Sequence, residues 1–146
     1  MGKMQTGGMV GMTFQRVLVP VDDSPHVLEL AQQATEFARE TGATLTFLHV
    51  VNTPKITSAK DIEQQKREYR WISDECREKA AAQGVSASSR VEVGSPVETI
   101  VSIAEREKFD LIIMGSKGQS HLRTLLVGSV ADQVMEHASC PVLLLK

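Results

Sequence analysis

The sequence has few cysteines, no long apolar run and no excess of charge of one sign. Its two cysteines, Cys76 and Cys140, form no Cys-x-x-Cys pair and have no partner cluster of histidines, which argues against a zinc site or a disulfide framework. No stretch reaches the roughly 18 apolar residues of a membrane-spanning helix. Acidic and basic residues are interspersed, with a net charge of −2, which argues against a nucleic-acid footprint. We therefore expect a cytoplasmic protein with neither a membrane nor a nucleic-acid partner.

Two common nucleotide-binding motifs are also missing. There is no G-x-x-x-x-G-K-[ST] loop and no G-x-G-x-x-G fingerprint, and the turn Asp22–Pro25 after the first predicted strand contains no glycine. Neither a P-loop ATPase nor an ordinary NAD enzyme is indicated.

The length of 146 residues suits one domain with a single hydrophobic core. The segment Met1–Met12 is short and rich in glycine, and it lacks the apolar stretch of a secretory signal. We expect a flexible leader over residues 1–13 and one domain over residues 14–146.

Within residues 14–146, short apolar runs typical of buried strands alternate with stretches in which apolar residues recur at helical spacing. Ser24 and Pro25 favour a helix start as N-cap and first helical residue, and Ser95 and Glu98 have the spacing of a capping box. The predicted strands are 16–21, 44–51, 87–93, 111–114 and 142–145, and the predicted helices begin at 25, 61, 96 and 130. This β-α alternation predicts an α/β fold, a parallel sheet with helices on both faces.

Ligands of such sheets bind at the carboxyl ends of the strands, beside the point where the winding direction reverses. Asp22 follows the first predicted strand and Gly115 follows the fourth, so both line one crevice if these strands are neighbours. An ionised carboxylate accepts hydrogen bonds from a ribose diol, and Asp22 is placed for that role with Asp23 as a competitor. Either carboxylate could instead serve only the positive end of the first helix.

The stretch 110–130 has the pattern of a strand, a glycine-bounded loop and a helix start. Gly115 and Gly118 bound the start of the loop, and Gly128 and Ser129 open the next amphipathic stretch. Glycine lets a phosphate approach the backbone, and unpaired N–H groups at a helix N-terminus bind anions. The pattern predicts a phosphate site, although such glycines could merely turn the chain and Ser129 could be an ordinary N-cap.

The spacing Gly115-x-x-Gly118, nine residues, then Gly128-Ser129 resembles the G-2x-G-9x-G-(S/T) nucleotide-binding motif of the universal stress proteins. The resemblance covers nearly the whole chain except the leader and residues 52–85. The other stretches that carry it are Leu18–Asp22, Leu48–Val50, Gly94–Pro96 and Pro141–Val142.

This resemblance implies an open five-stranded parallel sheet of order 3-2-1-4-5, a Rossmann-like fold similar to that of the adenine nucleotide alpha hydrolases, with ATP between the ends of strands one and four. Carried over by position, the residues around the adenosine are Pro20, Val21, Asp22, Val50 and Met114. Those around the ribose and phosphates are Gly115, Gly118, Gly128, Ser129 and Val130. A divalent ion, Mg²⁺ or Mn²⁺, would be held by phosphate oxygens and water rather than by a protein cage.

The function that the resemblance implies is that of an ATP-binding regulatory protein of the stress response, whose nucleotide alters loop 115–128 and thereby its association with unknown protein partners or with itself. A slow ATPase or self-phosphorylating enzyme is the alternative. Near the loop the sequence offers the cations Lys117, His121 and Arg123 but no obvious general base, so any catalysis should be slow.

A third hypothesis is a dimeric interaction module without nucleotide.

Similar family members pair through their last strand, and Val142–Leu145 is apolar where a sheet edge is predicted. An uncovered apolar edge favours pairing with another strand, so we expect a homodimer joined through this strand.

Overall fold

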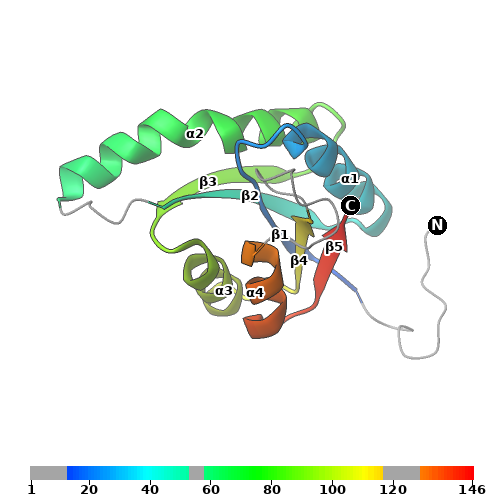
Figure 1. Ribbon diagram of the computed structural model, residues 1–146. Coiled ribbons are helices and arrows are strands. Elements are labelled where there is room, and N and C mark those ends of the chain that lie inside the picture. The colour runs from blue at the N-terminus through cyan, green and yellow to red at the C-terminus, as the bar shows by residue number, and fades with distance from the viewer. Residues whose placement is uncertain (1–12, 53–57, 117–128) are drawn as a thin grey trace.

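The computed structural model describes residues 13–52, 58–116 and 129–146. Strands and helices alternate along the chain, as the sequence pattern predicts (Figure 1). The elements are β1 (Arg16–Pro20), α1 (Val27–Thr41), β2 (Thr44–Val51), α2 (Ala59–Ala81), β3 (Ala87–Val93), α3 (Pro96–Arg106), β4 (Leu111–Gly115), α4 (Ser129–His137) and β5 (Val142–Leu145). The leader predicted over residues 1–13 lies almost wholly outside the described residues.

The five strands form one parallel sheet in the order β3-β2-β1-β4-β5. The chain builds outward from β1 to β3 and then returns to the other side of β1 with β4, so the winding direction reverses between β1 and β4. The predicted α/β fold and the strand order implied by the family resemblance are both confirmed.

Helices α1 and α2 cover one face of the sheet, and α3 and α4 cover the other (Figure 1). Val17 and Val19 of β1 belong to the core beneath α1 and α2, whereas Leu18 between them belongs to the core beneath α3 and α4. All three side chains are fully buried. Burial on both faces is why this strand is a continuous apolar run rather than an alternating one.

The start of α1 differs from the sequence prediction. Helix α1 begins at Val27, and its N-cap residue, His26, makes no side-chain cap hydrogen bond. The Val27 N–H donates to the Ser24 carbonyl at 3.2 Å, and the Ser24 hydroxyl accepts from the His26 N–H at 3.3 Å. The prediction of a helix start at Ser24 and Pro25 is wrong because these residues form a β-turn, in which proline favours the second position as readily as it favours the first helical residue.

Helix α3 begins at Pro96 as predicted, but the capping box is wrong. Ser95 occupies the N-cap position, but its side chain makes no cap hydrogen bond. The capping-box spacing of Ser95 and Glu98 therefore did not ensure that this hydrogen bond forms. The buried face of the helix carries Ile100, Ile103 and Ala104. Val101 of the same helix is only half-buried.

Helix α2 begins earlier than predicted, since Ser58 caps it by accepting from the Asp61 N–H at 3.1 Å. Its stripe of buried residues includes Cys76, which is fully buried. Burial raises the pKa of the Cys76 thiol to about 12, and Glu75 adds to the rise. Cys76 is therefore a core residue, and its thiol stays protonated at neutral pH.

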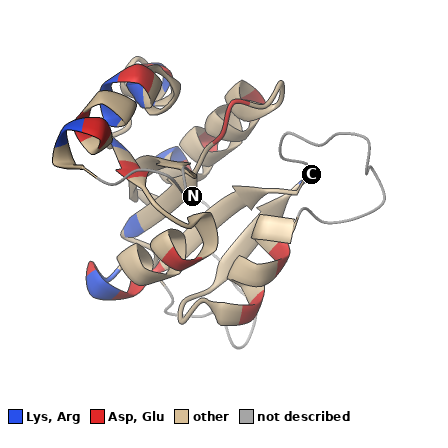
Figure 2. Ribbon diagram, turned by 60° about the vertical axis from the view of Figure 1, so that its left-hand side comes forward, with Lys and Arg blue, Asp and Glu red and all other residues tan. Residues whose placement is uncertain are grey.

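Ion pairs extend across the edge strand β3. Arg90 of that strand contacts Glu107 at 2.7 Å and Glu92 at 3.1 Å, and Lys66 of α2 contacts Glu92 at 3.5 Å. Figure 2 shows that acidic and basic residues are mixed along the helices rather than separated by sign. Charged side chains on an edge strand oppose pairing with a second chain, so β3 is the protected edge of the sheet.

No helix in the described parts of the chain is both long enough and apolar enough to span a membrane.

Replacing a buried leucine should cost much more stability than replacing an exposed one. Leu45 of β2 is 1% exposed and Leu28 of α1 is 37% exposed. We expect Leu45→Ala to lower the free energy of unfolding by about 3–5 kcal/mol, because it leaves a cavity in the core. The matched control Leu28→Ala should cost less than about 1 kcal/mol. Urea unfolding measures both, and equal losses would contradict the burial described here.

The ion pair of Glu107 should stabilise the fold only above acidic pH. The hydrogen bond from Arg90 lowers the pKa of the Glu107 carboxyl from its ordinary 4.5, so the stabilisation is present above that value and is lost as the pH falls through the lower folded-state pKa. Because the pair is partly exposed, Glu107→Gln should cost no more than about 1 kcal/mol at neutral pH.

In urea unfolding, the free energies of the parent and Glu107→Gln should converge as the solution is acidified. Glu105→Gln, at an exposed position of α3, serves as the control. A Glu107→Gln deficit that persists unchanged in acid would contradict the assignment.

Candidate functional site

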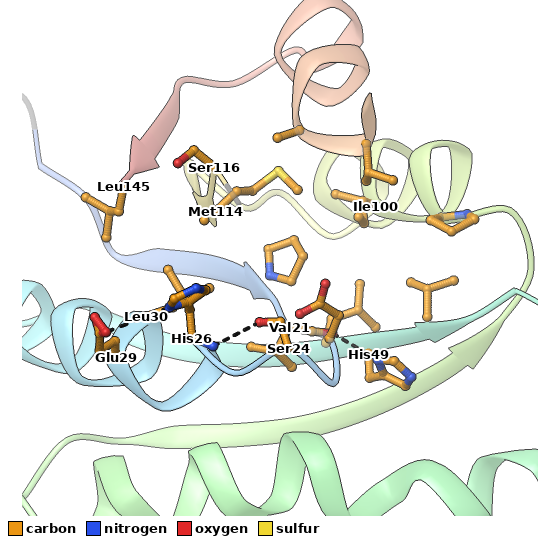
Figure 3. Close-up of a pocket in the computed structure, with 18 of the residues that line it drawn as sticks. Val21, Ser24, His26, Glu29, Leu30, His49, Ile100, Met114, Ser116 and Leu145 are labelled. Carbon is orange, nitrogen blue, oxygen red and sulfur yellow. Dashed lines mark hydrogen bonds and ion pairs between the residues drawn. The ribbon is translucent and has the colours of Figure 1, made fainter. Parts of the chain in front are cut away.

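A cleft of about 430 Å³ lies at the carboxyl ends of β1, β2 and β4, where the winding direction of the sheet reverses (Figure 3). Residues of α1 and α3, the first residues of α4 and the end of β5 complete its wall. Every predicted nucleotide-binding residue within the described part of the chain lines this cleft, namely Pro20, Val21, Asp22, Val50, Met114, Gly115, Ser129 and Val130. The sheet therefore brings together residues that are more than a hundred positions apart in the sequence.

The predicted residues Gly118 and Gly128 lie outside the described residues, as do Lys117, His121 and Arg123.

Part of the cleft wall is apolar. Ile100 of α3 and Met114 of β4 are 3% and 6% exposed, respectively, and both point into the space at the end of β1 in Figure 3. Pro20 and Val50 add apolar surface from the ends of β1 and β2. An apolar wall with a few convergent polar groups is typical of small-molecule sites.

The polar groups of the cleft come mainly from the loop after β1 and the start of α1. Asp22 is half-buried in the wall, and Ser24 is almost fully buried. At the start of α1, His26 Nδ1 lies 3.9 Å from a Glu29 carboxylate oxygen (Figure 3). The loop and the start of α1 thus present two carboxylates, a hydroxyl and an imidazole to one cavity.

Gly115 ends β4 in this wall, and the fold itself does not require a glycine there. Its φ is not positive, and a Cβ added to it would meet only Leu30 Cδ2 at 3.7 Å, an ordinary contact. By contrast, Gly42 and Gly84 have φ values of 79° and 82° that side chains rarely adopt. Glycine at position 115 therefore leaves open space in the cleft rather than relieving strain in the backbone.

His49 reaches the site from beneath the loop after β1. Its Nδ1 lies 2.9 Å from the Val21 carbonyl oxygen, and its ring lies 5.8 Å from that of Tyr69 on α2. The side chain thus links β2 to the residue before Asp22 (Figure 3).

The family model that matches residues 13–146 is that of the universal stress protein family. The chain belongs to this family. Universal stress protein MJ0531 of Methanocaldococcus jannaschii is 34% identical over 140 residues, which cover 91% of this chain and 82% of that protein.

Two solved structures of universal stress proteins share this fold and contain an adenine nucleotide. One is a complex with cAMP, with a TM-score of 0.74 and 26% identity over 92% of this chain and 99% of that chain. The other is a protein from Archaeoglobus fulgidus in complex with dAMP, with a TM-score of 0.65 and 25% identity over 92% of this chain and 100% of that chain.

Sequence reasoning missed several residues that line the cleft of this universal stress protein. The apolar residues among them have a sequence pattern that indicates core packing and nothing more. The position of Lys146 could have been predicted, because it follows the last strand and the ends of parallel strands share one edge of the sheet. The missed residues are Ser24, His26, Glu29, Leu30, Gln33, Leu48, His49, Pro96, Ile100, Ser116, Ala131, Leu145 and Lys146.

Proposed function

We propose that this universal stress protein binds adenine nucleotides, ATP in particular, in the cleft between the ends of β1 and β4, and that it acts as a nucleotide-dependent regulator in the stress response. The observation that carries the proposal is the convergence of Asp22, an apolar wall and the start of α4 on one cavity. The cAMP and dAMP complexes of two relatives support the choice of adenine as the base.

The apolar side of the cleft suits the base. Val50, Ile100 and Met114 offer a surface that a flat purine ring can cover, which removes apolar area from water. Asp22 would accept hydrogen bonds from the adenosine, since an ionised carboxylate is an acceptor for sugar hydroxyls. We therefore assign the adenosine to the region bounded by Pro20, Val21 and these residues.

The phosphates would lie toward α4. Ser129 and Val130 are the first residues of that helix, where backbone N–H groups without helical partners bind anions. The open space left by Gly115 would admit a ligand close to the backbone. Gly118 and Gly128 are assigned to the same function from the sequence motif.

A divalent ion, Mg²⁺ or Mn²⁺, would accompany the triphosphate. Among the described residues no group of three or more His, Cys, Asp or Glu side chains could hold a metal, so we assign the ion to phosphate oxygens and water. The ion would neutralise phosphate charge there, while the protein supplies the backbone N–H groups of α4.

Removing the Asp22 carboxylate should weaken ATP binding. We expect the parent protein to bind ATP in calorimetric titration with Mg²⁺, and Asp22→Ala to bind at least about tenfold more weakly, the cost of a lost hydrogen bond to a charged group. Asp23→Ala is the matched control, because Asp23 is outside the cleft lining. A larger loss in Asp23→Ala would move the anchor to that residue, and no adenine nucleotide binding by the parent would refute the proposal.

We also propose a homodimer joined through β5. This edge of the sheet is apolar, and Leu143 is 37% exposed, whereas the other edge carries the ion pairs of Arg90 and Glu92. An apolar edge strand with unpaired backbone groups favours pairing with a second copy.

Placing a charge on the exposed edge should separate the subunits. In analytical ultracentrifugation we expect the parent at twice the 16.0 kDa of one chain and Leu143→Lys at the mass of one chain, because a desolvated lysine opposes strand pairing. Met135→Lys on α4, at a residue with 39% exposure, is the control and should remain dimeric. A monomeric parent, or a dimer that survives Leu143→Lys but not Met135→Lys, would refute pairing through β5.

A further inference from the structure

We infer that His49 is a positioning residue for nucleotide binding, whose ring holds Val21 and thereby determines where Asp22 enters the cleft. The inference rests on the proposed function of that cleft. His49 itself lines the cleft, and its bond to the backbone of Val21 is what assigns it the positioning role.

The backbone of Val21 is held to β2 beyond the end of the β1 strand. Pairing of β1 with β2 ends at Pro20, opposite Leu48, and the Val21 N–H then donates to the Leu48 carbonyl at 2.8 Å. In a parallel ladder the next bond would bring a backbone N–H of β2 to the Val21 carbonyl. His49 supplies a side-chain donor to that carbonyl, at 2.9 Å from Nδ1, so both polar backbone groups of Val21 are bonded to β2.

This contact determines the tautomer of His49. A backbone carbonyl oxygen only accepts, so Nδ1 must carry the proton in the neutral ring as well as in the charged one. The neutral ring therefore keeps its lone pair on Nε2. The bond to Val21 persists in both charge states of the imidazole.

Packing holds the ring itself in place. Tyr69 of α2 lies against it, with the ring centroids 5.8 Å apart and the ring planes 36° apart. Val21, on the other side of the hydrogen bond, is 5% exposed. A connection thus runs from α2 through His49 and Val21 to Asp22, the carboxylate that lines the cleft in the loop after β1.

A carboxylate that binds a ligand is effective only when its supporting groups hold it in the productive geometry, to within about 0.5 Å. Without the His49 donor, the Val21 carbonyl loses a partner in a largely buried place, and the loop can relax toward water. Asp22 would then have to be ordered at the moment of binding. We therefore expect a lower affinity for ATP, although the same residues contact the nucleotide.

Three variants of His49 separate positioning from mere packing. Asparagine places an amide N–H where the imidazole has Nδ1, glutamine places it farther out toward the position of Nε2, and alanine removes it. We expect His49→Ala and His49→Gln to bind ATP with Mg²⁺ about tenfold more weakly than the parent, and His49→Asn to bind within about threefold of it. His137→Ala, at an exposed histidine of α4, is the control and should bind as the parent does.

Two further measurements distinguish the outcomes. Long-range ¹⁵N–¹H NMR of the neutral imidazole should show the proton of His49 on Nδ1. Urea unfolding of each variant shows how much of any change is loss of stability. If His49→Ala fails to fold, the comparison of His49→Asn with His49→Gln decides.

The inference is overturned if the alanine or glutamine variant binds ATP as tightly as the parent, or if asparagine restores nothing. A proton on Nε2 would overturn it as well. In each of these cases the parent still binds ATP, so the proposed function stands. If the parent binds none of ATP, ADP or AMP, the proposed function fails and this inference fails with it.

Discussion

The central position of β1 in the parallel sheet is the constraint on which the rest of the structure depends. Its backbone is paired with β2 on one side and β4 on the other, and its side chains alternate between two cores. Because both neighbours run parallel to it, all three strands end at the same edge of the sheet. Because β1 is followed by α1 on one face of the sheet and β4 is followed by α4 on the other face, the connections diverge at this edge and leave a cleft rather than a packed surface.

The chemistry of the cleft follows from this arrangement. The strand ends supply an apolar wall from residues that would otherwise be ordinary core, such as Ile100 and Met114. The loop after β1 supplies the carboxylate, and the start of α4 supplies backbone donors. None of these groups is unusual in itself. They form a site because the fold brings them together in one cavity. The proposed ligand, an adenine nucleotide, combines an apolar base, a polar sugar and anionic phosphates, and so offers a partner to each of these kinds of group.

The two edges of the sheet are treated differently, and this difference bears on assembly. At β3 the side chains of Arg90 and Glu92 join an ion-pair network that reaches α2 and the residue after α3. At β5 the strand is apolar and short. The proposed homodimer uses the apolar edge alone, and one such edge in each chain gives a closed pair rather than an open chain of subunits.

Much of the fold could be predicted from the sequence because strand and helix periodicities are local properties. The bounds of β2, β3 and β5 agree with the prediction. The family resemblance predicted that Asp22, Gly115 and Ser129 lie together, and all three line the cleft. The sequence pattern led to a wrong prediction where the same residues suit two different local structures. Ser24-Pro25 suits a helix start and a turn equally well, and only the contacts of Val27 and His26 decided for the turn.

Tertiary structure alone decided the role of residues whose type carries no functional signal. Leu30, Ile100 and Leu145 have the periodicity of core residues, and they became part of the cleft because strands distant in sequence end beside them. His49 is a half-buried histidine in a strand, and its bond to the Val21 carbonyl exists because β1 and β2 pair in one particular register. The sequence by itself determined the elements, their order and the motif, since these depend on neighbours along the chain. The cleft and its supporting contacts depend on neighbours in space, which only the packed sheet brings together.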